Sequence, residues 1–184
     1  MERIKKIAVP LSGVMTFFIS TCFAWTIFSK NIPQNIATWI MVLILDIVGV
    51  VLVFNDGNKK PYLQMGWTIS AFLVTSAIVL NDNPWHWGMV ESVSFALCVI
   101  SIVIWIKASA RKALWAYMAA SYISCFPLIV DYWNIPQPAT LWVWVCTIGA
   151  CLLSIYGSKK DFANVFVPLN AIVANGIIAV LCVL

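Results

Sequence analysis

The chain has 184 residues, of which 62% are apolar, 14% aromatic and only 10% charged, and its mean hydropathy is +0.95. A soluble domain has about 45–50% apolar and about 25% charged residues, so this composition excludes a water-soluble globular protein and indicates an integral membrane protein. The formal net charge of +4 reflects where the basic residues lie in the loops, and it does not indicate a nucleic-acid partner.

Seven apolar runs follow one another along the chain, each near the roughly 20 residues that a helix needs to cross about 30 Å of hydrocarbon. Short polar segments separate these runs, so consecutive helices must turn straight back and lie antiparallel. A transmembrane β-barrel would instead show shorter segments of alternating character. We predict an all-α integral membrane protein with helices at residues 7–28, 36–54, 62–80, 88–106, 113–132, 139–156 and 163–184.

The basic residues are distributed unequally between the two sets of connecting segments. Lys30 alone follows the first helix, whereas the other ten precede the first helix or follow the second, fourth and sixth. By the positive-inside rule, the N-terminus is cytoplasmic and the C-terminus external. We therefore expect a multi-pass protein of the cell (inner, cytoplasmic) membrane. The ten residues are Arg3, Lys5, Lys6, Lys59, Lys60, Lys107, Arg111, Lys112, Lys159 and Lys160.

Most of the tryptophans lie near predicted helix ends, where an aromatic belt contacts the lipid headgroups. Trp67 and Trp144 lie deeper, which makes them candidate platforms for a ligand; packing in the core or against lipid is the alternative. The residues assigned to the belt are Trp25, Trp39, Trp85, Trp87, Trp133 and Trp142 at the outer boundary and Trp105 and Trp115 at the inner one.

A proline-containing element occurs twice. The sequence NIPQNIATW at residues 31–39 returns as NIPQPATLW at residues 134–142, and the same offset of 103 positions aligns residues 21–23 (TCF) with residues 124–126 (SCF). At an offset of 100 positions further pairs align. We predict that the first three helices are duplicated as the last three. The further pairs are Lys59 with Lys159, Lys60 with Lys160, Ser70 with Asn170 and Thr75 with Asn175.

The fourth helix is then a connector between two triplets. An odd linker helix keeps both triplets in the same membrane orientation, which gives parallel repeats about an axis along the membrane normal. We predict a first three-helix bundle at residues 1–80, a linker helix at 81–112 and a second three-helix bundle at 113–184.

This 3+1+3 pattern, with a Pro-Gln pair after the first and the fifth helix, resembles the SWEET/PQ-loop/Pnu-type superfamily of small-solute transporters. Residues 155–176 (IYGSKKDFANVFVPLNAIVANG) are similar to the SWEET pattern of Tyr-Gly, a short loop with Asp and an aromatic residue, then Pro and Asn. The residues at these places are Tyr156, Gly157, Asp161, Phe162, Pro168 and Asn170.

A basic loop that leads into a helix with Asn164, Phe166 and Asn170 is similar to the Pnu-type vitamin transporters. SWEETs place their N-terminus outside, so the expected topology favours the Pnu type. The resemblance implies seven helices and facilitative movement of a vitamin or a sugar by rocking of two three-helix bundles.

Asp46 lies halfway along the second helix, where a carboxylate costs roughly 2.5–3.5 kcal/mol on insertion scales. Lysine and arginine are absent from that depth. The side chain is therefore either protonated or hydrogen-bonded to a Ser, Thr or Asn of a neighbouring helix. Two roles stay open: a proton-coupling or substrate-binding acid, or a polar contact that holds helices together.

Asn170 and Asn175 are the stronger candidates for solute binding, because an amide offers two donors and an acceptor without a charge. This chemistry suits a neutral hydroxylated or amide-bearing solute. Their spacing of five residues predicts that only one faces the pathway. We favour Asn170, with hydrogen bonding between helices as the alternative role. The full predicted substrate-binding set is Asn170, Asn175, Trp67, Ser70, Trp144 and Asp46, and the predicted hinge residues are Pro33, Gln34, Pro136 and Gln137.

The sequence lacks the residue patterns that metal binding, redox chemistry or catalysis would need. The only histidine, His86, lies in a predicted outer loop, the six cysteines form no C-x-x-C pair, and the loops are too short for a catalytic domain. We expect no enzyme activity, no metal and no cofactor. The expected partners are the lipid bilayer and a small solute, with homo-oligomers left open. The alternatives to a transporter are a membrane subunit of a larger complex, such as a vitamin-binding component, and a channel or structural membrane protein.

Overall fold

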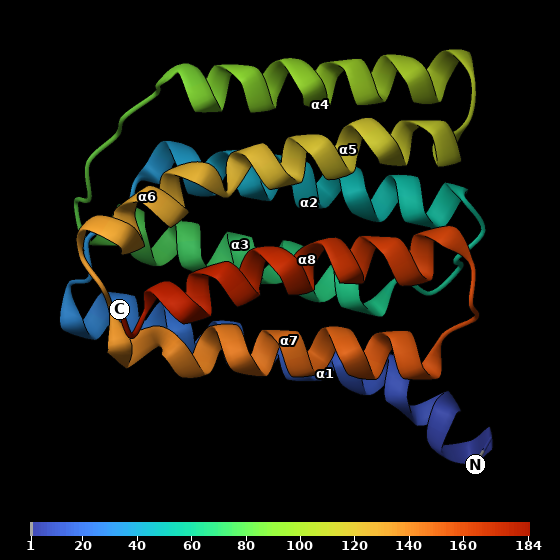
Figure 1. Ribbon diagram of the computed structural model, residues 1–184, viewed down its shortest axis with the longest axis horizontal. Coiled ribbons are helices and arrows are strands. Elements are labelled where there is room, and N and C mark those ends of the chain that lie inside the picture. Colours follow the sequence, from blue (N-terminus) through green and yellow to red (C-terminus); the bar gives the residue numbers. More distant parts are fainter. Residues whose placement is uncertain (1) are drawn as a thin grey trace.

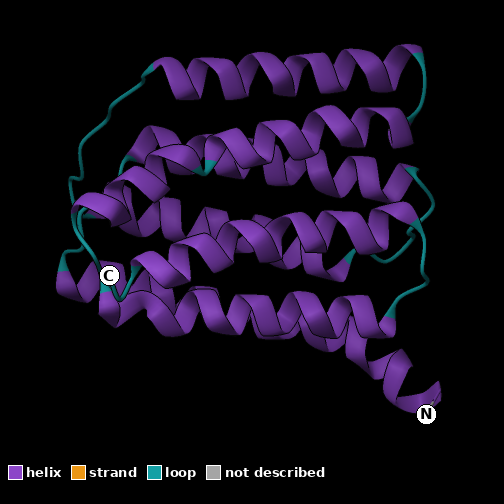
Figure 2. Ribbon diagram, viewed as in Figure 1, coloured by secondary structure: helices purple, strands orange, loops and turns teal. Residues whose placement is uncertain are grey.

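The computed structural model describes residues 2–184, apart from the side chains of Glu2 and Arg3. Met1 and the side chain of Arg3, which enters the prediction of orientation, therefore lie outside the described residues. Every regular element in residues 2–184 is helical (Figures 1 and 2). The elements are α1 (Glu2–Lys30), α2 (Ile36–Asn55), α3 (Tyr62–Leu80), α4 (Met89–Lys107), α5 (Ala110–Ser124), α6 (Phe126–Asn134), η1 (Pro138–Thr140), α7 (Leu141–Gly157) and α8 (Phe162–Leu181).

Polar side chains at the helix starts explain where several helices begin. The side chains of Asn35, Ser109 and Asp161 accept hydrogen bonds from backbone amides in the first turns of α2, α5 and α8. Such caps satisfy amides that have no partner within the helix. The predicted boundaries of the second and third spans therefore agree with the structure to within one residue.

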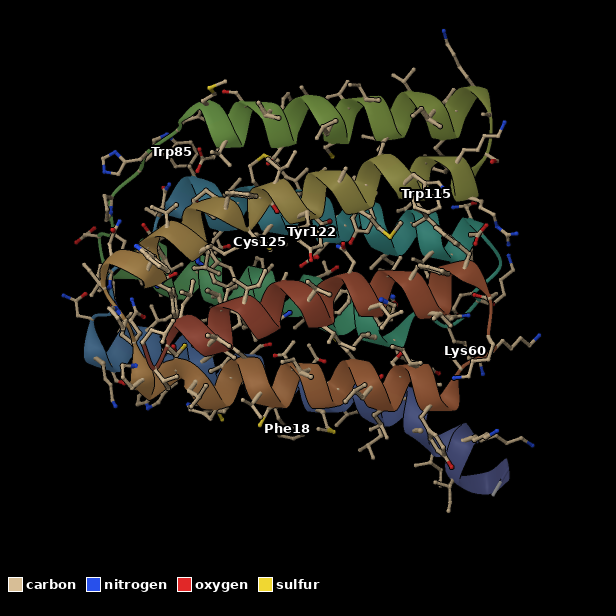
Figure 3. All side chains as sticks on the ribbon, viewed as in Figure 1. Phe18, Lys60, Trp85, Trp115, Tyr122 and Cys125 are labelled. Atoms are coloured by element: carbon tan, nitrogen blue, oxygen red, sulfur yellow. The ribbon has the colours of Figure 1, made fainter. Side chains whose placement is uncertain are left out.

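Within residues 2–184, seven helical segments are long and apolar enough to span a membrane, as a multi-pass membrane protein requires. They run alternately in opposite directions, so every second connection lies at the same end of the bundle (Figure 1). We call the end with residues 56–61, 108–109 and 158–161 the basic end, and the end with residues 31–35, 81–88 and 135–137 the proline end. Lys60 and Trp115 lie at the basic end, and Trp85 lies at the proline end (Figure 3).

The helices pack as two groups with α4 beside them. In the N-half, formed by α1–α3, helix α3 contacts both α1 and α2. In the C-half, formed by α5–α8, helix α8 contacts α7, α5 and α6. The halves meet along two seams, α1 with α7 and α2 with α5, while α4 lies at the edge of the bundle and packs mainly on α5 (Figure 1).

The fifth span differs from the single helix that was predicted. It is divided into α5, which ends at Ser124, and α6, which begins at Phe126. Pro127 has no amide hydrogen to donate to the preceding turn, and its ring disfavours a helical conformation in the residue before it. The interruption therefore falls in the SCF sequence of the second copy, whereas α1 continues unbroken through the TCF sequence at 21–23.

Candidate functional site

A cavity of about 160 Å³ lies between the two halves. Residues from α1, α2, α3, α5, α6, α7 and α8 line it, and α4 contributes none among the described residues. Its polar wall residues include Asp46, Ser70 and Asn170, each near the middle of its helix. The cavity is therefore deep within the spans and is shared by both halves.

All six residues predicted to bind a substrate lie on the wall of this cavity: Asn170, Asn175, Trp67, Ser70, Trp144 and Asp46. They come from four helices and from both halves of the bundle. Both asparagines lie on this wall, and which of them faces a solute pathway stays a prediction. Their role in binding a solute stays a prediction.

The two asparagines differ in their hydrogen bonds. Asn175 Nδ2 donates to the carbonyl oxygen of Ala171 one turn earlier, at 2.7 Å. The side chain of Asn170 forms no hydrogen bond with any residue that the structure describes, although it faces the cavity. The side-chain amide of Asn170 is therefore free to donate hydrogen bonds to a ligand and to accept them from it.

Asp46 faces the cavity without a partner. Within residues 2–184 its carboxyl group forms no ion pair and no hydrogen bond. The structure therefore provides no contact by which Asp46 could hold two helices together. The sequence left two states open for this side chain, protonation or hydrogen bonding to a Ser, Thr or Asn of a neighbouring helix. The structure does not show the hydrogen bond.

Sequence reasoning missed several wall residues, among them Tyr117, Ser121, Phe23 and Trp39. Trp39 was assigned to the aromatic belt, but only 7% of its surface is exposed, and its Nε1 donates to Gln34 Oε1 at 3.0 Å. This hydrogen bond turns the indole into the bundle and away from lipid. The repetition of the element that ends in this tryptophan was the available signal for an internal role.

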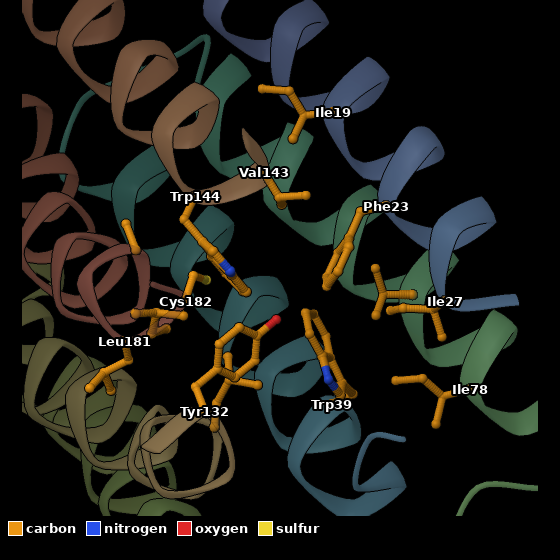
Figure 4. Packing of buried hydrophobic residues seen from close by; sticks show 14 of the residues in the cluster. Ile19, Phe23, Ile27, Trp39, Ile78, Tyr132, Val143, Trp144, Leu181 and Cys182 are labelled. Carbon is orange, nitrogen blue, oxygen red and sulfur yellow. The ribbon is translucent and has the colours of Figure 1, made fainter. Parts of the chain in front are cut away.

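Four aromatic rings pack together near the proline end, and three of them, Phe23, Trp39 and Trp144, also line the cavity. The ring of Phe23 lies 6.0 Å from that of Trp39 and 5.7 Å from that of Trp144, and Tyr132 lies 5.7 Å from Trp144 (Figure 4). Such edge-to-face and tilted pairs are favourable arrangements of aromatic rings. We call Phe23, Trp39, Tyr132 and Trp144 the aromatic cluster; through Phe23 and Trp144 it joins α1 to α7.

Polar contacts join the halves at the basic end. Asn58 Nδ2 donates to Asn164 Oδ1 at 2.6 Å, and Asn164 Nδ2 donates to Asp161 Oδ2 at 2.8 Å. Arg111 Nε, at the start of α5, lies 3.0 Å from Asp56 Oδ1 at the end of α2. Among the described residues, no hydrogen bond between the halves occurs at the proline end, so the two ends are held by different interactions.

The predicted hinge residues lie in the connections at the proline end. Pro33 and Gln34 precede α2, and Pro136 and Gln137 precede η1. Gln34 is anchored, since its backbone amide donates to Asn83 Oδ1 at 2.9 Å and its side chain accepts from Trp39. Motion at these four residues stays a prediction.

We expect Gly49→Ala to destabilise the protein by about 1–3 kcal/mol, the usual cost of overpacking. Gly49 follows Asp46 by three residues on the same face of α2, and a Cβ there would overlap the hydroxyl and ring of Tyr117 on α5. Thermal unfolding of the purified protein measures the change. Gly149→Ala is the matched control, because a Cβ at Gly149 meets no heavy atom within 4 Å. An equal effect of both substitutions would contradict the prediction.

The described residues contain no group of three or more His, Cys, Asp or Glu side chains that could hold a metal ion. Comparison with family models, with curated proteins and with solved structures finds no match to this chain. The cavity and the arrangement of the helices around it are therefore the features that indicate a function.

Proposed function

We propose that this protein is a facilitative transporter that moves a small polar solute across a membrane by rocking of the N-half against the C-half. The observation that carries the proposal is a cavity deep within the spans, with a few polar side chains on a mainly apolar wall that the two halves share. A cavity in this position becomes accessible from one side or the other when the halves tilt relative to each other, as in other transporters built from two bundles.

The packing of the helices supports the 3+1+3 interpretation. The third helix of the N-half lies between the other two, and α8, the corresponding helix of the C-half, has the same relation to its neighbours. The two seams are also equivalent under the repeat, because each joins the first span of one half to the second span of the other. In this proposal residues 1–80 and 113–184 are the two bundles and residues 81–112 form the linker, as in the SWEET/PQ-loop/Pnu-type arrangement that the motifs resemble.

The different closures at the two ends fit alternating access. The aromatic cluster has to separate for the cavity to open at the proline end. The Asn58–Asn164 and Arg111–Asp56 contacts have to break for it to open at the basic end. Because the basic residues favour the cytoplasm, we propose that the basic end is cytoplasmic and the proline end external, in a cell membrane.

A binding assay with a panel of solutes tests the proposal. A solute that binds the folded protein raises its unfolding temperature by mass action, so at least one of a panel of sugars, nucleosides and B-vitamins is expected to raise the melting temperature. We expect Asn170→Ala to abolish this rise, because its unpaired amide faces the cavity.

Asn55→Ala is the matched control for this assay. It removes the same amide from an exposed position, where Asn55 Nδ2 donates to the carbonyl oxygen of Val51 at 2.7 Å. The control should leave the rise unchanged. If no member of the panel stabilises the protein and proteoliposomes take up none of them, the transport proposal fails for these solute classes. If Asn170→Ala keeps the full rise, the binding site lies elsewhere.

A further inference from the structure

The wall of the cavity carries one acidic side chain and no basic partner for it among the described residues. Asp46 is the only acidic residue on it, and no Lys, Arg or His is among the described residues that line it. The other titratable wall residues are Tyr117 and Cys125, which are neutral in their ordinary protonation states near neutral pH. Ionising an acid at this depth is costly unless a positive charge pairs with it, so a cation in the cavity would stabilise the charged form of Asp46.

Aromatic rings make up much of the remaining wall. Five of them come from five different helices of the two halves: Phe23, Trp39, Trp67, Tyr117 and Trp144. The faces of such rings attract cations, most strongly where water is excluded. A carboxyl group together with several aromatic rings is the chemistry that recognises an organic ammonium or a positively charged heterocycle.

A metal ion fits this wall less well. Hard cations require several oxygen ligands at short distance, and Asp46 is the one carboxylate available on the wall. Several hydroxyl groups of the wall already donate to carbonyl oxygens of their own helices, including Thr16, Ser20 and Thr147. The size of the cavity favours a small organic molecule, since a buried apolar space of about 150 Å³ admits benzene.

We propose that the solute is a small organic cation whose positive charge pairs with Asp46 and whose apolar part packs against the aromatic wall. Asn170 on α8 and Ser70 on α3 then form hydrogen bonds with the polar groups of the solute. This assignment rests on the proposed transport function and replaces the neutral solute that the asparagines alone suggest. Asp46 is in this view the residue that selects the charge of the solute.

Cys125 offers a test within the native chain, because this residue lies on the wall of the same cavity. The purified protein is treated at about pH 8 with two thiol reagents of similar size, the cationic 2-aminoethyl and the anionic 2-sulfonatoethyl methanethiosulfonate. Mass spectrometry of the peptide with Cys125 gives the two rates, each divided by the rate of the same reagent with 2-mercaptoethanol. We expect a cation preference of at least about tenfold, from the attraction between unit charges across a partly buried gap.

The variant Asp46→Asn should reduce this preference to near unity while Cys125 still reacts. The matched control is Asp82→Asn, which removes the same charge from an exposed turn at the proline end. Asp82 has a φ of 50°, which Asn also tolerates, so the control should leave the preference unchanged.

The outcomes separate the two proposals. A wild-type protein without charge preference, or a preference that persists in Asp46→Asn, overturns the organic-cation assignment and leaves transport of a neutral solute standing. A thiol of Cys125 that reacts with neither reagent, in a folded protein, shows that the cavity does not open to water and overturns the transport function itself.

Discussion

Replacing Gly13 by valine is expected to destabilise the protein by about 3 kcal/mol, at the upper end of the usual cost of overpacking. A Cβ at Gly13 would lie 2.5 Å from the carbonyl oxygen of Tyr62 and 3.0 Å from its carbonyl carbon. These are backbone atoms of α3, so no side chain can rotate away and the two helices must separate. Small residues allow this close approach of helices in membrane proteins.

The contact is reciprocal, which is why the expected effect is large. A Cβ at Gly66 of α3 would lie 3.0 Å from the carbonyl oxygen of Gly13 and 3.0 Å from Thr16 Cβ. Thermal unfolding of the purified protein measures the loss. Gly176→Val is the control, because a Cβ at Gly176 in α8 meets no heavy atom within 4 Å. Equal losses from the two valine substitutions would show that α1 and α3 do not touch at Gly13.

Phe23→Ala is expected both to destabilise the protein by about 3 kcal/mol and to open the proline end. Phe23 is 2% exposed and its ring contacts Trp39 and Trp144, so truncation leaves a cavity of the kind that costs about 3–5 kcal/mol in protein cores. It also removes the aromatic contact between α1 and α7. We expect Cys125 to react faster with the anionic sulfonatoethyl reagent added outside intact cells.

Phe18→Ala provides the control for this experiment. Phe18 lies on the same helix, points away from the bundle and is 61% exposed (Figure 3), so its loss should change neither stability nor labelling. Unchanged labelling in Phe23→Ala would contradict the role of the aromatic cluster as a closure. Faster labelling only from the cytoplasmic side would reverse the proposed orientation.

The extent of the second and third spans was predictable because it depends on length and on interruption by polar residues. The second and third helices begin at Ile36 and Tyr62, where the apolar runs begin. The six candidate binding residues could also be selected, because a polar or ionisable side chain in mid-span is costly and turns inward or towards water. All six lie on one cavity wall.

The orientation of apolar side chains could not be predicted in the same way. Lipid and helix interfaces are both apolar, so no hydrophobic pattern distinguishes the inward face of a membrane helix. Trp39 therefore resembled the belt residues near it, and its burial and its hydrogen bond to Gln34 show that it is internal. Phe23 and Tyr117 were missed for the same reason, since their burial depends on neighbours from other helices.

The break at Cys125 reverses which side chains are exposed in the two similar sequences, TCF at residues 21–23 and SCF at residues 124–126. In the unbroken α1, Cys22 is exposed and Phe23 is buried; after the break, Cys125 lines the cavity and Phe126 is 53% exposed. Pro127, which corresponds to Ala24 at the offset of the repeat, is the residue that makes this difference. It also separates the segment with Leu128 and Tyr132 from the backbone hydrogen bonds of α5.

The first spans of the two halves are therefore built differently. In the N-half, α1 carries Phe23 on one continuous helix of 29 residues. In the C-half, α6 is a separate helix of nine residues that begins after Cys125, so we expect it to tilt independently of α5. We therefore expect the segment with Tyr132 at the proline end to move more freely than the matching part of α1, where Ala24 stands at the position of Pro127.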